Sequence, residues 1–224
     1  MAYLPERIVL APLIKRLLLR KVEGLENLSK STPYIFAANH NSHIDEFVIM
    51  PPVYTGTRRV THFFADRKHW FQGKLYFRFL AWRFKAIPVD RGQGTGDQAI
   101  ERGVRYLKKG HNVIIYPEGT RGDSFELKRG KVGVAKMALW ANVPVVPLGV
   151  FGTHLLMPKG KHTPAIRRVV TVKIGKPMYF NDYADRAGDQ NTYREITDRI
   201  MCEIANLLGQ EYRHCAAGHQ STSP

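Results

Sequence analysis

The segment from Asn39 to Phe47, NHNSHIDEF, gathers two histidines, a serine and two acids between two apolar runs. A histidine beside a carboxylate can act as a general base, because the acid orients the ring and stabilises the imidazolium after proton uptake. His40 and Asp45 are the candidate pair. Inside one continuous helix, a step of five residues would turn their side chains about 140° apart. We therefore expect His40 to lie in the turn before a helix that carries Asp45.

Three other interpretations of this segment stay open. Ser42 followed by Asp45 is a capping-box pattern, which predicts Ser42 as the N-cap and the acid at the third helical position. The side chains of His40, His43 and Asp45 suit a metal-dependent hydrolase, but no HExxH or CxxC pattern accompanies them, so we predict no metal site. Ser42 as a nucleophile lacks the G-x-S-x-G elbow. Capping does not explain His40, and a neighbouring helix N-terminus favours its neutral ring.

Two other stretches, VDRG and PEGTRG, place Arg91 and Arg121 in glycine-containing turns directly after apolar runs. Guanidinium groups match phosphate oxygens, and glycine lets backbone amides approach a ligand closely. The two arginines are therefore predicted to clamp a phosphate group. A nucleotide fold is not indicated, because the Walker pattern and a G-x-G-x-x-G motif after a strand are both missing.

The middle of the chain alternates β-rich apolar runs with helical patterns, which is typical of an α/β domain. The predicted strands are 34–38, 60–65, 86–90, 112–116, 145–150 and 169–174, and the predicted helices are 42–50, 68–84, 97–109, 130–141 and 193–208. The polar stretches follow strands, and ligand sites gather at the carboxyl ends of strands in such sheets. We predict a single α/β domain with a mixed, mostly parallel sheet flanked by helices.

The ends of the chain are predicted to differ from this domain, which we place at residues 25–210. Residues 1–24 hold a basic amphipathic segment that is too charged to span a bilayer, and it fits either a membrane interface or ordinary packing on the domain. Residues 211–224 are expected to form a flexible tail. Cys202 and Cys215 form no CxxC motif and no disulfide framework, so we expect a reducing compartment.

The charge of the chain favours an anionic partner. Lys and Arg number 34 against 19 Asp and Glu, a formal net charge of +15. Nucleic acid, phospholipid headgroups, a nucleotide-bearing cofactor and an acidic carrier protein all fit this charge. A nucleic-acid-binding module is the main alternative to an enzyme, but the chain shows no helix-turn-helix, RRM or KH signature, so we predict no nucleic-acid partner.

NHNSHID resembles the NHxSxxD motif of the glycerolipid acyltransferases, the family of the 1-acylglycerol-3-phosphate acyltransferases. AIPVDRG, YPEGTRG and VPVVPLGV look like the second, third and fourth sequence blocks of that family, in the same order. The resemblance runs from about Leu25 to about Gly175. Two departures, Pro88-Val89 before Asp-Arg and a short segment after EGTR, leave the acceptor and the acyl chain length open.

The resemblance implies an acyltransferase in which His40 is the general base and Asp45 orients it. The activated hydroxyl of lysophosphatidic acid would attack the thioester of acyl-CoA or acyl-carrier protein directly and give phosphatidic acid, with no further cofactor. Glycerol 3-phosphate or another lysolipid is the alternative acceptor. The aromatic run 63–84 resembles a segment that helps to line the acyl tunnel, although it also suits a helix core. The residues implied to bind the glycerol phosphate are Arg91, Glu118, Gly119, Thr120 and Arg121.

The resemblance and the charge together predict the partners and the location. The partners are acyl-CoA or acyl-carrier protein, a lysophospholipid and, through the basic N-terminal helix, an anionic membrane surface. Many relatives carry transmembrane helices, whereas this N-terminal segment is only amphipathic. We therefore expect a peripheral, monotopic protein on the cytoplasmic side of the membrane.

Overall fold

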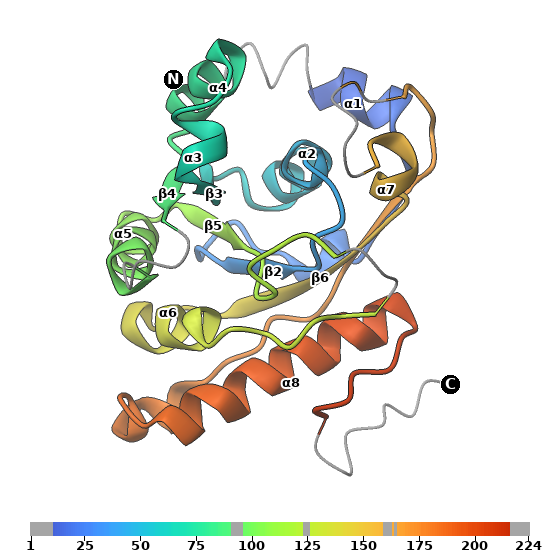
Figure 1. Ribbon diagram of the computed structural model, residues 1–224. Coiled ribbons are helices and arrows are strands. Elements are labelled where there is room, and N and C mark those ends of the chain that lie inside the picture. Colours follow the sequence, from blue (N-terminus) through green and yellow to red (C-terminus); the bar gives the residue numbers. More distant parts are fainter. Residues whose placement is uncertain (1–10, 91–95, 123–125, 159–162, 164, 216–224) are drawn as a thin grey trace.

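The computed structural model describes residues 11–90, 96–122, 126–158, 163 and 165–215 (Figure 1). Its centre is a seven-stranded sheet with the order β1-β7-β6-β2-β5-β3-β4. Neighbouring strands pair in parallel except β6 and β7, which are antiparallel. The predicted α/β fold class is therefore confirmed. The strands are β1 (Leu19–Glu23), β2 (Ile35–Ala38), β3 (Thr61–Asp66), β4 (Ile87–Val89), β5 (Asn112–Ile115), β6 (Val145–Phe151) and β7 (Val170–Ile174).

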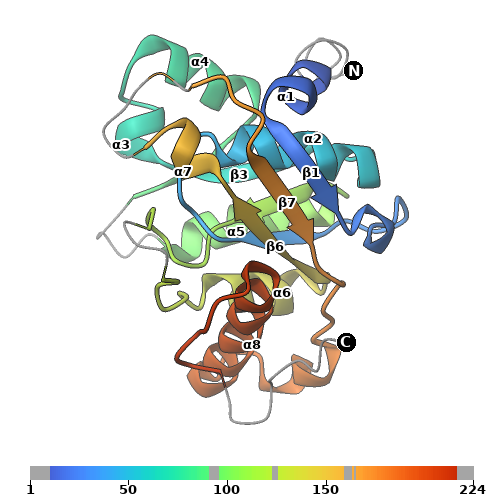
Figure 2. The ribbon, with the colours of Figure 1, turned by 90° about the vertical axis from the view of Figure 1, so that its right-hand side faces the viewer.

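Helices cover both faces of the sheet (Figures 1 and 2). Ile35 and Ala37 of β2 pack with the side chains of α5, α6 and α8, whereas Phe36 and Ala38 pack with those of α2. This alternation follows from the two-residue period of a strand. The helices are α1 (Ala11–Leu17), α2 (Asp45–Thr57), α3 (Arg67–Trp70), α4 (Leu75–Arg83), α5 (Gly96–Lys108), α6 (Gly133–Ala141), α7 (Thr153–Leu156) and α8 (Gln190–Leu208), with 3-10 turns η2 (Leu25–Asn27) and η3 (Asn181–Arg186).

All six predicted strands are present, with ends that differ by about one residue. The helices predicted at 130–141 and 193–208 begin instead at Gly133 and Gln190, and two other predicted helices differ more in extent. The helix expected to end at Met50 continues to Thr57 through Pro51 and Pro52. Both prolines are buried, so their packing offsets the backbone hydrogen bonds that proline cannot make. The helix expected at 68–84 is split into α3 and α4. Gly73 lies in the break, where a Cβ would sit 2.2 Å from the carbonyl oxygen of His69.

The N-terminal segment was only partly predicted. Within residues 11–24, α1 has seven residues and is followed by β1, an edge strand that pairs with β7. Residues 19–23 therefore belong to the sheet and not to a separate amphipathic segment. Leu19 is buried while Arg20 and Lys21 are exposed, as suits an edge strand that must not pair with another chain. Residues 1–10 lie outside the described residues.

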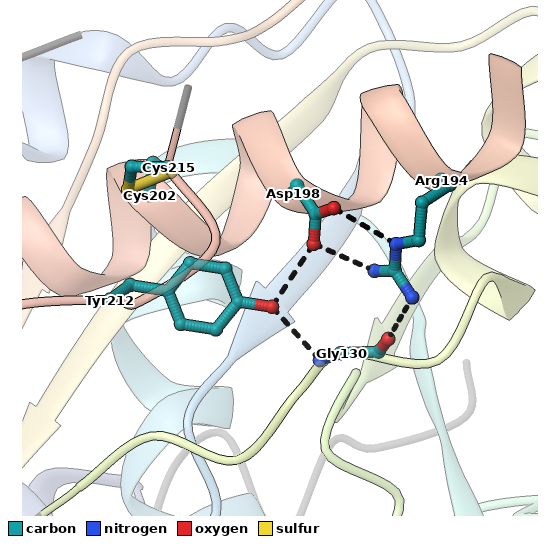
Figure 3. The surroundings of a disulfide bond; sticks show 6 residues. All are labelled: Gly130, Arg194, Asp198, Cys202, Tyr212 and Cys215. Atoms are coloured by element: carbon teal, nitrogen blue, oxygen red, sulfur yellow. Dashed lines mark hydrogen bonds and ion pairs between the residues drawn. A yellow bond between two sulfur atoms is a disulfide. The ribbon is translucent and has the colours of Figure 1, made fainter. Parts of the chain in front are cut away.

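The C-terminal boundary also needs correction, because residues 211–215 pack on the domain. Cys215 forms a disulfide with Cys202 of α8, and Tyr212 is buried between them and the loop before α6 (Figure 3). Sequence spacing did not reveal this pairing, because the two cysteines meet only after the chain turns back along α8. Paired cysteines are typical of oxidising compartments, so the pairing does not support the expected reducing compartment. Residues 216–224 lie outside the described residues.

The C-terminal turn holds the loop before α6 in place (Figure 3). The Tyr212 hydroxyl donates to Asp198 at 3.1 Å and accepts from the Gly130 N–H at 3.2 Å. Arg194 pairs with both oxygens of Asp198, at 3.0 and 2.9 Å, and donates to the Gly130 carbonyl at 2.7 Å. Gly130 fits against α8 because a Cβ there would lie 2.7 Å from Met201. These contacts matter for the site, because Lys128 of the same loop donates its N–H to Glu118 of the PEGTRG segment.

Reduction of the disulfide is expected to lower the free energy of unfolding by about 2–3 kcal/mol, because the bond restrains the unfolded chain over a short loop. The measurement is denaturant unfolding with and without dithiothreitol. A Cys202→Ala/Cys215→Ala double variant should show the lower value in both conditions. An unchanged wild-type midpoint after confirmed reduction would contradict this prediction.

Candidate active site

Asn39 joins the end of β2 to the end of β6. Its side-chain amide donates to the Val150 carbonyl at 2.9 Å, and its oxygen accepts from the Val150 N–H at 2.8 Å. Asn39 is buried, so both contacts are made away from water. The amide continues the strand ladder for one step, and this fixes the direction in which the next residue, His40, leaves the sheet.

His40 and Asp45 form the predicted pair. His40 Nδ1 lies 2.9 Å from Asp45 Oδ2, and the same oxygen accepts from the backbone N–H groups of Asn41 and Ser42 at 2.8 and 2.9 Å. Asp45 is fully buried. A carboxylate that already accepts two N–H groups requires a proton on Nδ1 of the neutral ring. His40 lines a cavity. Its Nε2 atom is then left unprotonated and can accept a proton.

The role predicted for Ser42 was wrong. The helix begins at Asp45 after Ile44, and no side chain caps it. The Ser42 hydroxyl instead donates to the carbonyl of Met157 at 2.8 Å and is buried. Asp45 itself satisfies the N–H groups of the turn before the helix, so a serine cap is not needed. The expected placement of His40 in the turn before the helix is confirmed.

The PEGTRG segment after β5 holds the backbone of His40 from two directions. Glu118 Oε1 accepts the His40 N–H at 3.0 Å, and Gly122 N–H donates to the His40 carbonyl at 2.7 Å. Glu118 Oε2 accepts the N–H of Lys128 at 3.1 Å. Burial raises the pKa of Glu118, and the two N–H donors act in the opposite direction. Glu118 was implied to bind substrate, but its two oxygens serve the backbone of the site.

Three of the residues implied for phosphate binding, Gly119, Thr120 and Arg121, line the cavity. Lys128 Nζ supports this wall by donating to the Arg121 carbonyl at 2.8 Å and to the Thr120 hydroxyl at 3.3 Å. Gly119 has a φ of +70°, and a Cβ there would lie 2.8 Å from the Lys131 side chain. Glycine at this position therefore permits both the turn and the approach of a lysine.

The cavity has a volume of about 870 Å³. Lys131 adds positive charge to its wall, whereas Lys136 is paired at 2.7 Å with Asp97, which lines the same cavity. An apolar part of the wall contains Phe64, Trp70 and Ile100. Phe64 and Trp70 belong to the aromatic run 63–84, whose part in an acyl tunnel stays a prediction. A cavity with cations on one part and apolar groups on another suits an anionic amphiphile.

His43 and His69 lie beside the His40–Asp45 pair. Their rings stack at 4.5 Å, and both line the cavity. Burial, followed by the positive charge of Arg121, lowers the pKa of His43 to about 3, so the ring stays neutral at physiological pH. Among the residues that the structure describes, no group of three or more His, Cys, Asp or Glu is arranged to hold a metal ion.

Arg91 lies outside the described residues, and its predicted part in the clamp stays a prediction. Val89 and Asp90, which precede it, line the cavity, and Asp90 pairs with Arg67 at 2.7 Å. The convergence of the stretches after β2 and β5 is confirmed. Sequence reasoning missed His69, Lys131 and Lys136, because they come from segments with no motif. They reach the cavity only through the packing of α3, the loop before α6 and α6 itself.

Comparison with known proteins identifies the family. Residues 19–150, more than half of the chain, match the family described as Acyltransferase. The 1-acyl-sn-glycerol-3-phosphate acyltransferase of Bacillus subtilis (strain 168) is 31% identical over 193 residues, which cover 85% of this chain and 90% of that protein. The Saccharomyces cerevisiae protein of the same name is 30% identical over 217 residues, 89% of this chain and 68% of that protein.

A plant relative and a solved structure also match this chain. The chloroplastic 1-acyl-sn-glycerol-3-phosphate acyltransferase BAT2 of Brassica napus is 29% identical over 70% of this chain. The match covers only 44% of the length of that relative. The crystal structure of the 1-acyl-sn-glycerophosphate (LPA) acyltransferase PlsC from Thermotoga maritima has a TM-score of 0.61 at 23% identity. That match covers 90% of this chain and 81% of PlsC, and it supports the fold. By the family match and the Bacillus relative, the chain belongs to the glycerolipid acyltransferase family, as its four ordered sequence blocks predicted.

Proposed function

We propose that the protein transfers a fatty acyl group from acyl-CoA or acyl-carrier protein to the free hydroxyl of lysophosphatidic acid, giving phosphatidic acid. The observation that carries this proposal is the hydrogen bond from His40 Nδ1 to the buried Asp45 carboxylate, at the wall of a cavity with cationic and apolar parts. The names of the relatives support lysophosphatidic acid as the acceptor.

The reaction needs one base and no covalent enzyme intermediate. His40 Nε2 takes the proton of the acceptor hydroxyl while its oxygen attacks the thioester carbonyl carbon, and the new C–O bond forms. The C–S bond then breaks, and the leaving thiolate takes the proton from the imidazolium, which returns His40 to its neutral form. Asp45 stabilises this imidazolium because its carboxylate stays buried against the opposite ring nitrogen.

The phosphate of the acceptor is assigned to the part of the cavity formed by Gly119, Thr120 and Arg121, with Lys131 nearby. A guanidinium and backbone amides at a glycine turn match phosphate oxygens. Arg91 is proposed to complete this clamp from the turn after β4. Glu118 is proposed to act indirectly, by holding the His40 backbone.

Glu46 does not oppose an anionic substrate. It lines the cavity and is buried, and burial followed by the charge of Asp45 raises its pKa well above the ordinary value. Its carboxyl group is therefore protonated at pH values where a solvated glutamate is ionised. A neutral Glu46 adds no negative charge beside the proposed phosphate position.

We propose a peripheral location on the cytoplasmic side of the membrane. Among the described helices, none combines the length and the apolar character needed to cross a bilayer. The disulfide between Cys202 and Cys215 argues for an oxidising compartment instead. Alkylation of free thiols in intact cells, followed by a mass measurement, tests the side, because a fully alkylated pair supports the cytoplasm and a protected pair contradicts it.

Replacing His40 tests the base. His40→Ala should lower kcat by at least about 10²-fold, because proton transfer to a placed base contributes about 10²- to 10⁴-fold. His40→Gln should lose as much activity, because its amide can replace the hydrogen bond to Asp45 but cannot accept a proton. The assay is acyl transfer from labelled acyl-CoA, with circular dichroism as the control for folding.

Either of two results would contradict the proposed mechanism. Near-normal turnover by either folded His40 variant would remove His40 as the base. Loss of wild-type activity after dialysis against EDTA, with recovery on adding a divalent metal, would favour the metal-dependent hydrolase interpretation.

Replacing Arg121 tests the phosphate position. Arg121→Ala should raise the KM for lysophosphatidic acid by about tenfold or more and leave the KM for the acyl donor nearly unchanged. Arg121→Lys should recover only part of the loss, because lysine keeps the charge but lacks the guanidinium fork. Arg102→Ala, at an exposed arginine of α5, is the matched control. Equal effects on the two KM values would exclude Arg121 from the proposed phosphate position.

Replacing Glu46 tests the pH dependence. The folded protein keeps a proton on Glu46 that the unfolded chain releases above its ordinary pKa of 4.5, so this group lowers stability as the pH rises from 4.5 toward the folded pKa. The slope is about 1.4 kcal/mol per pH unit at most. Glu46→Gln should therefore be more stable than wild type at pH 8, with a smaller difference at pH 5. Urea unfolding at both pH values measures it, and a difference that is the same at both would contradict the protonated state.

A further inference from the structure

Helix α4 exposes a stripe of large apolar side chains. Leu75, Phe79 and Trp82 are 76%, 57% and 72% exposed. At about 100° per residue, these three positions fall within about 60° of arc on one side of the helix. A contiguous apolar stripe of this kind on a short surface helix marks a contact with something other than water. We call these three residues the α4 stripe.

The opposite side of α4 already packs against the domain. Ala81 and Phe84 are buried, and the Phe77 ring lies 4.4 Å from the ring of His69 and 5.2 Å from that of Trp70. The inner side therefore accounts for the attachment of α4 to the fold. The α4 stripe is not needed for that attachment, and its apolar surface is available for another contact.

Positive charge borders the α4 stripe. Lys74 and Arg78 are exposed, and on a helix they fall along one edge of the stripe, while Arg83 falls along the other. The whole segment from Arg67 to Val89 contains six Lys or Arg residues and no Asp or Glu. Tryptophan and arginine beside an aliphatic side chain are the groups that settle at the headgroup level of a bilayer. The charge complements anionic lipid headgroups.

The position of α4 in the molecule also supports a lipid surface as the partner of the α4 stripe. Figures 1 and 2 differ by a turn about the vertical axis, and both place α4 and α1 at the upper end of the molecule, opposite α8. Leu13 of α1 is also 48% exposed. Apolar groups of two helices are thus available at one end of the fold. The short α3, which directly precedes α4, carries His69 and Trp70 into the cavity wall, so this end adjoins the candidate active site.

We infer that α4 is a bilayer-docking helix, with the α4 stripe at the boundary between headgroups and acyl chains and with Lys74 and Arg78 on lipid phosphates. The inference rests on the proposed function only for the membrane residence of the lipid acceptor. Docking through α4 holds the cavity close to the surface from which that acceptor comes. It also supplies a contact that does not depend on residues 1–10.

Co-sedimentation with vesicles tests the docking. The probe is phosphatidylcholine vesicles with and without phosphatidylglycerol. A Leu75→Ser/Phe79→Ser/Trp82→Ser variant should bind at least about tenfold more weakly to both kinds of vesicle, because the apolar burial is lost. Lys74→Glu/Arg78→Glu should lose binding mainly to the vesicles with phosphatidylglycerol. Because these side chains are exposed, the variants should keep the wild-type circular dichroism and thermal midpoint.

The matched controls use other positions. Tyr179 follows β7, its side chain is 63% exposed, and its neighbour Phe180 belongs to the core that packs with α8. The Tyr179→Ser variant should bind vesicles like the wild type. Deletion of residues 1–10 in the wild type and in the triple variant shows how much binding each segment adds. Trp82 fluorescence should be quenched by brominated phosphatidylcholine, and the Trp82→Ser variant should lose that component.

Three results would overturn the inference. Unchanged vesicle binding by the triple variant excludes the α4 stripe as the docking surface. An absence of Trp82 quenching places it outside the bilayer. A concentration-dependent wild-type dimer that becomes monomeric in the triple variant, with vesicle binding retained, assigns the stripe to a second copy of this chain.

The same variants separate this inference from the proposed function. With a short-chain lysophosphatidic acid below its micelle concentration and no vesicles, the triple variant should keep the wild-type kcat/KM. Its activity on vesicle-borne acceptor should fall with its binding. If the wild type transferred no acyl group in either assay but still bound vesicles through α4, the proposed function would fail and the docking would stand.

Discussion

A single buried carboxylate oxygen, Oδ2 of Asp45, organises the candidate active site. It accepts hydrogen bonds from His40 Nδ1–H and from the backbone N–H groups of Asn41 and Ser42, all within 2.9 Å. These contacts shape the turn before α2 and orient the His40 ring at the same time. In the proposed mechanism this carboxylate has two roles, because the charge that would stabilise an imidazolium is also the acceptor that the turn requires.

The turn at His40 is held from outside by segments that are distant in sequence. Asn39 ties it to β6, and Glu118 ties it to the loop that leads to Gly130. That loop is in turn held by α8 and by Tyr212, whose own segment is tethered by the disulfide. The position of the proposed base therefore depends on contacts that reach the far end of the chain. Buried networks of this kind keep a site rigid because each polar group has a partner with defined geometry.

The two ends of the molecule have different characters. At the end with α8, polar side chains and a covalent bond secure the chain against itself. At the end with α1 and α4, apolar side chains remain exposed beside cations. The cavity, with its cationic and apolar parts, adjoins the second end through α3. This polarity matches a reaction in which one substrate is a membrane lipid and the other is a thioester from the aqueous side.

Local pattern determined much of this protein. The six apolar runs determined their strands, and the spacing of His40 and Asp45 required a turn before α2, because both features depend on periods within a few residues. Only the tertiary structure decided the rest. The tertiary structure adds Leu19–Glu23 to the sheet as an edge strand and extends α2 through Pro51 and Pro52. It also pairs Cys202 with Cys215. It brings the Glu118 carboxylate to the backbone N–H groups of His40 and Lys128 as well. These outcomes rest on contacts between residues far apart in the chain, whose free energies outweigh local propensity and leave no periodic trace in the sequence.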